Sequence, residues 1–314
     1  MARPLRIEYS GAFYHVTSRG NEQRDVFKSQ RDREKFLGYL ESATQRYGAA
    51  IHAHCLMSNH YHLLLETPEG NLSQIMRHVN GAYTTYFNVK RKRAGHLFQG
   101  RYKAILVEAD DYLAELSRYI HLNPVRVGIV ESPEQYQWSS YRIYTGHSKP
   151  LEWLRTGFIL GCFAKKTEDA QKKYRTFVEG LLGKEYENPL TRTIGTSILG
   201  SAAFIDEIKT THLQGKENGN IPALRQLASR PSPEVIMKEA KAVFADDVKL
   251  ARRASIYLCH KYSGMKLREI GESFNVRDTA ISEASRRFAK ELEMDGKLRD
   301  MLAGISGKLK MCGM

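Results

Sequence analysis

The order of strand and helix patterns in the first 146 residues constrains the fold more than any other feature of the chain. Residues 6–20 alternate as a strand does, 32–48 have a helical period, and two apolar runs follow at 51–58 and 60–67. Further along come a long helical pattern, a strand and a second helix, the last at 110–122. These periods predict an α+β fold with a β-α-β-β beginning, in which an antiparallel sheet has helices packed on one side.

The helix predicted over 110–122 has a clear apolar face and a clear end. Leu113, Leu116 and Ile120 recur at helical spacing and should face the core. Pro124 follows two residues after Leu122. Because proline lacks a backbone N–H, we expect the helix to stop before it.

Beyond residue 146 we expect two further parts. Residues 147–220 contain helical pieces and end in a linker, 214–220, that is rich in polar residues and glycine. Residues 221–314 contain four short helical segments separated by tight turns, which are typical of a helix-turn-helix bundle. The predicted domains are therefore 1–146, 147–220 and 221–314.

The composition excludes several classes of protein. With 48 Lys and Arg against 35 Asp and Glu, the chain carries a formal charge of +13, which predicts a polyanionic partner. A hydrophobic fraction of 42% is ordinary for a folded protein and argues against disorder as the main state. No apolar run approaches the length of a membrane span, so we expect a cytoplasmic protein. The four cysteines lie far apart, which indicates neither a zinc finger nor a disulfide framework.

Two histidine pairs could bind a metal. His60 and His62 are two residues apart on a predicted strand, so both imidazoles leave the same face of the sheet. His52 and His54 have the same spacing on the preceding strand. The pattern alone does not choose between the two pairs, and either could instead be ordinary strand histidines.

A tyrosine and an asparagine are placed one helical turn apart near the end of the helix at 110–122. Tyr119 and Asn123 are four residues apart and so share a face, whereas His121 is rotated by about 200° from Tyr119 and faces elsewhere. A simpler interpretation is that Tyr119 only flanks the apolar stripe. Pro124 also disfavours helical geometry at Asn123, so the shared face is an open question at this stage.

Four segments together carry a family resemblance. They are MSNHYHLLLE at 57–66, HLFQGRYKAILVEADDYL at 96–113, RYIHLNPVRVGIV at 118–130 and WSSYRIYTG at 138–146. In unbroken order over residues 1–146 they resemble the single-tyrosine HUH transposases, specifically the REP-associated tyrosine transposase group. The resemblance implies a ferredoxin-like catalytic domain of the HUH endonuclease type. It also implies that His60 and His62 are the paired metal ligands, that Tyr119 is the nucleophile and that Asn123 is the third ligand.

The implied chemistry is metal-dependent cleavage and rejoining of single-stranded or hairpin DNA. A tyrosine nucleophile joined to a 5′ phosphate keeps the bond energy for later rejoining. A free phenol has a pKa near 10 and is a poor nucleophile at neutral pH, so a divalent cation that polarises the phosphate would help. Two imidazoles and an amide oxygen do not select one metal, and we expect Mg²⁺ with Mn²⁺ able to substitute. A symmetric dimer and a monomer are both compatible with the resemblance.

A basic cluster follows the long helix in the catalytic part. Phosphate contact is one interpretation of these side chains, and a solvated helix end that favours the dipole is the other. The residues are Lys90, Arg91, Lys92, Arg93, Arg101 and Lys103.

Residues 232–290 resemble the DNA-binding domain of the bacterial replication initiator DnaA. A short helix, a turn and an expected recognition helix carry the resemblance, but the family's usual His-Thr-Thr is replaced by Thr279, Ala280 and Ile281. Base preference therefore should not transfer. The candidates for DNA contact, against the alternative of merely exposed arginines, are Arg252, Arg253, Arg277, Arg286 and Arg287.

Three functions fit these features to different degrees. A transposase accounts for the histidine pair, Tyr119 and the basic charge together. A non-catalytic DNA-binding regulator derived from a transposase would need only the charge and the helix-turn-helix. A metal-dependent phosphodiesterase that uses water would need the histidines but no tyrosine.

Overall fold

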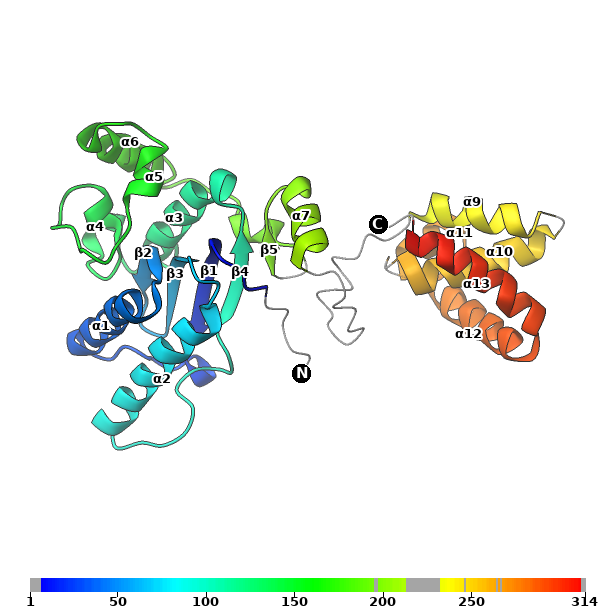
Figure 1. Cartoon of the computed structure of the whole chain (residues 1–314), viewed down its shortest axis with the longest axis horizontal. Helices are drawn as coiled ribbons and strands as arrows, with labels where there is room; N and C mark the ends of the chain where they lie inside the picture. Colours follow the sequence, from blue (N-terminus) through cyan, green and yellow to red (C-terminus); the bar gives the residue numbers. More distant parts are fainter. Residues whose placement is uncertain are drawn as a thin grey trace. The chain divides into compact units, whose positions relative to one another are not determined.

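The computed structural model describes residues 7–194, 197–212, 232–245, 247–263, 265 and 267–311. The chain divides into two compact units, residues 1–223 and 224–314, each with its own hydrophobic core (Figure 1). The predicted linker at 214–220 and Cys312 lie outside the described residues. Within them, Cys55, Cys162 and Cys259 are free thiols, and Cys162 is exposed.

The first unit is built on a five-stranded sheet in the order β2-β3-β1-β4-β5. Its strands are β1 (Ala12–Arg19), β2 (Ala50–Leu56), β3 (His60–Thr67), β4 (Lys103–Val107) and β5 (Ile198–Leu199). The first four are antiparallel and alternate with helices as βαββαβ, so the predicted α+β, ferredoxin-like fold is confirmed. β5 pairs with β4 in parallel, which makes the complete sheet mixed.

One face of the sheet is covered by α1 (Gln30–Tyr47) and α2 (Leu72–Lys90) (Figure 1). An aromatic core joins the two layers: Phe36 of α1 lies 4.8 Å from Tyr61 of β3 and 5.1 Å from Tyr83 of α2, centroid to centroid. α1 begins where the Ser29 side chain accepts a hydrogen bond from the Asp32 N–H, and it ends at Gly48, whose φ of 63° suits glycine. Ser29 and Gly48 therefore set the ends of α1, and the aromatic contacts pack α1 against β3 and α2.

The other face is covered by α3 (Ala109–Arg126). Leu116 and Ile120 of α3 share a core with Cys55 of β2 and Leu64 of β3. The prediction that helices pack on one side of the sheet was therefore wrong. The reason is that residues 61–65 of β3 are buried without interruption, and a strand with both faces apolar needs a layer on each.

α3 also continues through the residue predicted to end it. Pro124 lies inside the helix, two residues before its last residue. Proline there removes only one backbone donor, and the helix end is still closed by the Val127 N–H, which donates to the Asn123 carbonyl. The prediction that the helix stops before Pro124 was thus wrong, and Asn123 lies within the helix.

The region after residue 146 adds to the first unit. Tyr174 and Val178 of α6 (Thr167–Glu179) belong to the same core as α3, and β5 extends the sheet. The shorter elements of the unit are α4 (Tyr141–Tyr144), α5 (Gly157–Gly161), α7 (Ala202–His212) and the 3₁₀ turns Asn21–Gln23, Pro133–Gln135 and Pro189–Arg192. Among the described residues, α5, α6 and β5 therefore share one core with α3 and the sheet.

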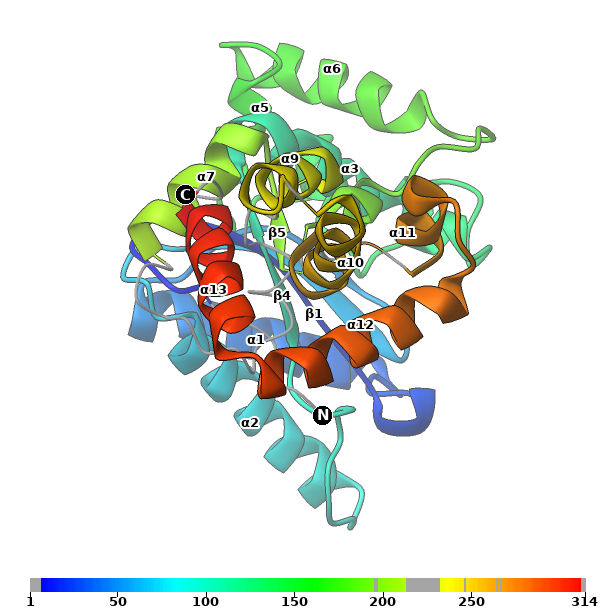
Figure 2. The same cartoon turned by 90° about the vertical axis from the view of Figure 1, so that its right-hand side faces the viewer.

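The second unit is helical, and no helix of the described residues in either unit is long and apolar enough to cross a lipid bilayer. Its elements are α9 (Pro233–Val243), α10 (Val248–Leu258) with a π-helical turn (Cys259–Ser263), α11 (Leu267–Phe274), α12 (Asp278–Met294) and α13 (Gly296–Met311). α10 packs against α9 and α12, and α13 also packs against those two helices (Figure 2). The four predicted segments are present, and α13 is a fifth that the sequence pattern did not indicate.

Candidate functional site

β3 presents two histidines on the face of the sheet that α3 covers. His60 and His62 lie two residues apart, with ring centroids separated by 5.0 Å and ring planes 75° apart. His62 is buried, and His60 is partly exposed. Strand alternation thus places the pair as the sequence predicts.

α3 brings Tyr119 to these histidines from the opposite layer. The Tyr119 ring centroid lies 5.9 Å from that of His62, with the rings nearly perpendicular. Asn123 is one turn further along, and its Nδ2 donates a hydrogen bond of 2.8 Å to the Tyr119 carbonyl. The structure therefore brings Tyr119 to the His60–His62 pair, and Asn123 lies one helical turn after Tyr119.

The other histidines considered from the sequence lie elsewhere. Both ring nitrogens of His52 are engaged, Nδ1 with the Arg155 carbonyl and Nε2 with the Glu66 carboxylate, each at 3.1 Å. His54 is buried against Trp153. His121 faces away from the site, as predicted, and its ring bonds to two hydroxyl groups of the core.

Burial keeps the site histidines neutral. It lowers the pKa of His15 and of His60 to about 4, with nearby Arg19 adding to the effect at His60. The pKa of His62 is lowered well below its usual value, first by burial and then by the neighbouring His15 and His60. Neutral imidazoles keep a lone pair, which is the form that binds a metal.

The donor atoms present fit a small metal site. His60 Nδ1 bonds to Asn59 Oδ1 at 2.6 Å, and Asn123 uses its Nδ2, so the hydrogen bonds found among the described residues leave both Nε2 atoms and Asn123 Oδ1 available. The described residues contain no group of three His, Cys, Asp or Glu side chains that could hold a metal. A site here would therefore combine two imidazoles with an amide oxygen, and open positions would remain for substrate oxygens.

Two residues at this site were missed by the sequence analysis. His15 of β1 is buried, and its Nε2 lies 3.0 Å from His62 Nδ1. The Arg126 guanidinium lies over the Tyr119 ring, with Cζ 4.8 Å from the ring centroid. Arg126 is seven residues after Tyr119, which is two helical turns along the same face. A prediction that the helix continues through Pro124 would therefore have placed Arg126 beside Tyr119. No sequence signal fixes the register that brings His15 to His62.

Part of the predicted basic cluster serves the fold. Lys90 and Arg91 both pair with the fully buried Asp32 of α1, Lys90 at 2.8 Å. Burial alone would raise the pKa of Asp32, but hydrogen bonds from these two residues outweigh it and lower the pKa to about 2. These two ion pairs therefore hold the end of α2 against α1.

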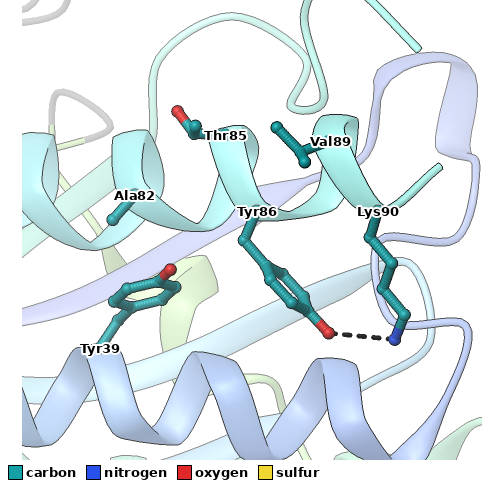
Figure 3. A pocket seen from close by; sticks show the side chains of 6 residues that line it. All are labelled: Tyr39, Ala82, Thr85, Tyr86, Val89 and Lys90. Atoms are coloured by element: carbon teal, nitrogen blue, oxygen red, sulfur yellow. Dashed lines mark hydrogen bonds between the residues drawn. The ribbon is translucent and has the colours of Figure 1, made fainter. Parts of the chain in front are cut away.

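The same end of α2 borders a groove of about 570 Å³ between α1 and α2. Figure 3 shows Tyr39 of α1 and Tyr86 of α2 entering it from facing helices, with Tyr86 bonded to Lys90. Its remaining lining residues are Ala82, Thr85 and Val89. Apart from Lys90, no predicted site residue lines this groove.

The other predicted basic residues are exposed. In the first unit these are Lys92, Arg93, Arg101 and Lys103. In the second unit Arg252 donates to the Phe274 carbonyl, and Arg253 and Arg287 pair with Glu291 and Glu283. Within the described part of the chain, no ion pair or hydrogen bond engages the side chain of Arg277 or Arg286. Arg277 is the residue directly before α12, and Arg286 lies at the middle of that helix.

Comparison with known proteins finds similarity in the part of the chain that contains this site. Residues 8–123, which include β1 to β4 and most of α3, match the sequence model of the family described as "Transposase IS200 like". The match covers a little over a third of the chain and shows what this segment is similar to. The match contains His15, His60, His62, Tyr119 and Asn123, and it ends before Arg126.

Two individual proteins are similar to the chain over its first part. A Haemophilus influenzae protein, provisionally named a REP-associated tyrosine transposase, is 27% identical over 131 residues, which cover 38% of this chain and 74% of that protein. A solved structure of a REP-associated tyrosine transposase bound to a REP hairpin is 17% identical, with a TM-score of 0.41. It covers 49% of this chain and 92% of that one.

Proposed function

We propose that the chain is a transposase that cuts and rejoins single-stranded or hairpin DNA through a covalent bond between Tyr119 and a 5′ phosphate. The observation that carries the proposal is the meeting of Tyr119 with the His60–His62 pair between α3 and β3. The match of residues 8–123 to the sequence model of the IS200-like transposases supports it. So does the similarity to a protein named as a REP-associated transposase.

The reaction is a transesterification that needs no external energy source. Tyr119 Oη attacks the phosphorus, and the Tyr119–phosphate bond forms while the bond from phosphorus to the 3′ oxygen breaks. The phenolic proton is released to solvent, and the departing 3′ oxygen takes up a proton. Reversal by a 3′ hydroxyl rejoins the strand, so one residue serves both steps.

His60, His62 and Asn123 would hold a divalent cation, Mg²⁺ with Mn²⁺ able to substitute. When bound, such a cation offsets negative charge on the phosphate oxygens. Arg126 supplies a second positive charge beside Tyr119 from the same helix face. Neutral histidines on β3 and a cation on α3 thus flank the position of the attacked phosphate.

The second unit would increase affinity for the target. α11 and α12 are joined by the three-residue turn 275–277, which has the order of a helix-turn-helix. Arg277 and Arg286 of this motif are exposed and could contact phosphates. We therefore propose that residues 232–290 bind DNA in the manner of the DnaA DNA-binding domain, with a base preference of their own.

The test is to trap the adduct with hairpin DNA libraries labelled at the 3′ end, because the phosphate stays on the 3′ fragment. We expect the Tyr119→Phe protein to bind DNA but to form no adduct on a denaturing gel. Tyr186→Phe is the matched control, since Tyr186 also contacts Arg126, with 5.5 Å from its ring centroid to Arg126 Cζ. An adduct that persists in Tyr119→Phe would refute the proposal.

The same assay separates the other two functions. A water-using phosphodiesterase would cut without an adduct and would leave a free end on both fragments. A regulator would bind without cutting. Substitution of His60 or His62 by alanine should abolish cleavage, whereas His52→Ala should retain most of it, because both His52 nitrogens are engaged elsewhere.

A further inference from the structure

Among the described residues, the ring of His15 has one polar contact, and that contact is with a residue proposed to bind metal. Its Nε2 lies 3.0 Å from His62 Nδ1, and the ring planes are within 12° of parallel. The other ring nitrogen, His15 Nδ1, is buried and has no hydrogen-bond partner among the described atoms. His15 is 2% exposed. A buried imidazole that makes one polar contact points to a role in that contact.

The direction of this bond determines what His62 can do. A hydrogen bond between two imidazole nitrogens needs one that carries the proton and one that is bare. If His15 donates, His62 Nδ1 is the bare nitrogen, so the proton of neutral His62 sits on Nε2 and blocks it as a ligand. If His62 Nδ1 donates, His62 Nε2 keeps its lone pair. Only the second direction is compatible with a metal on His62 Nε2.

We propose that His15 is a positioning residue that accepts a hydrogen bond from His62 Nδ1–H and so fixes the tautomer and the ring orientation of His62 for metal binding. The inference rests on the metal assignment in the proposed function. Metal-bound histidines commonly donate their second N–H to an acceptor nearby, and here the acceptor is another imidazole instead of a carboxylate or carbonyl oxygen.

The fold explains why this acceptor comes from β1. Thr17 is the residue directly opposite His62 in the antiparallel pair, and His15 lies two residues before Thr17 in β1, on the same face. The His15 ring also meets Tyr119 edge to face, with centroids 6.1 Å apart. His15 therefore contacts both the proposed ligand and the proposed nucleophile, from a strand that contributes neither.

Two substitutions of His15 distinguish a role as hydrogen-bond acceptor from that of a ring that is only buried. In His15→Gln the amide oxygen can still accept from His62 Nδ1–H, whereas His15→Phe keeps an aromatic ring without an acceptor. Affinity for Mn²⁺ is measured by calorimetry on the full chain without DNA. We expect His15→Phe to bind about 10- to 100-fold more weakly and His15→Gln to keep most of the affinity. His54→Phe, at an equally buried histidine outside the site, should not change it.

A second measurement keeps the inference testable if His15→Phe does not fold. In the ¹⁵N-histidine-labelled wild-type protein loaded with Mg²⁺, long-range ¹H–¹⁵N spectra should show His62 protonated on Nδ1. Protonation of His62 on Nε2 in the loaded protein would overturn the inference. So would a folded His15→Phe protein with wild-type Mn²⁺ affinity, while the proposed function would stand. A wild-type protein that binds no Mn²⁺ would overturn the metal assignment and this inference with it.

Discussion

Replacement of Arg126 by glutamine tests whether a cation beside the tyrosine contributes to the proposed chemistry. The Arg126 guanidinium lies between two aromatic rings, 4.8 Å from the centroid of Tyr119 and 5.5 Å from that of Tyr186. Among the described residues it forms no ion pair with a carboxylate. Its charge is therefore available to negative charge that develops at Tyr119 and the attacked phosphate.

The magnitude follows from this distance. Two unit charges 4.8 Å apart interact by about 3.5 kcal/mol at an effective dielectric constant of 20. The contact of the cation with the neutral ring, about 0.5–1 kcal/mol, already exists before the reaction and does not lower the barrier. About 2.5–3 kcal/mol remain, which corresponds to a loss of about 70- to 160-fold in the cleavage rate.

The assay is single-turnover cleavage of the hairpin identified by adduct trapping, with protein in excess so that binding does not limit the rate. Arg118→Gln is the matched control. Arg118 is on the same helix and also lies over an aromatic ring, 4.0 Å from the Phe177 centroid, but it pairs with Glu115 away from the site. Equal rates for Arg126→Gln and wild type, or equal losses in both variants, would refute the reasoning.

Three further outcomes are expected. Asp32→Asn should lower the free energy of unfolding in urea by about 2–3 kcal/mol, because it leaves the partly buried Lys90 and Arg91 without their carboxylate; an unchanged midpoint would contradict this. Burial lowers the pKa of His121 to about 3, so the unfolded chain binds a proton below pH 6.5 that the folded chain does not; His121 alone should contribute about 2 kcal/mol to the loss of stability between pH 6.5 and 5, a share that His121→Asn should remove. A chain that ends at residue 223 should still form the adduct but show a flatter dependence of DNA affinity on salt, and an unchanged slope would place the phosphate contacts in the first unit.

Periodicity in the sequence offered the proposed ligands and nucleophile as two local pairs, but it did not by itself select them. Two-residue spacing on a strand places His60 with His62, and four-residue spacing on a helix places Tyr119 with Asn123. Each pair is local, so its geometry follows from one element. The contact between the two pairs depends on tertiary packing, and only the resemblance to a family indicated it in advance.

Contacts between distant elements were out of reach for the same reason. The pairing of β1 with β3 sets His15 beside His62, and no spacing along the chain encodes that register. Lys90 and Arg91 look like free surface charge until Asp32, nearly sixty residues earlier, is found between them. β5 has only two residues, which is too short for a periodic signal.

The two sides of α3 explain how the fold holds the proposed nucleophile. On the core side, the Tyr174 hydroxyl donates to Ser117 Oγ, so it must accept from His121 Nδ1–H, and His121 Nε2 in turn accepts from Ser140. This network fixes the rotation of α3 about its axis. Because His121 is about 200° around the helix from Tyr119, the rotation that satisfies the buried network is also the rotation that turns Tyr119 toward His62. Substitutions that remove this network should therefore displace the Tyr119 ring, although they leave Tyr119 itself unchanged.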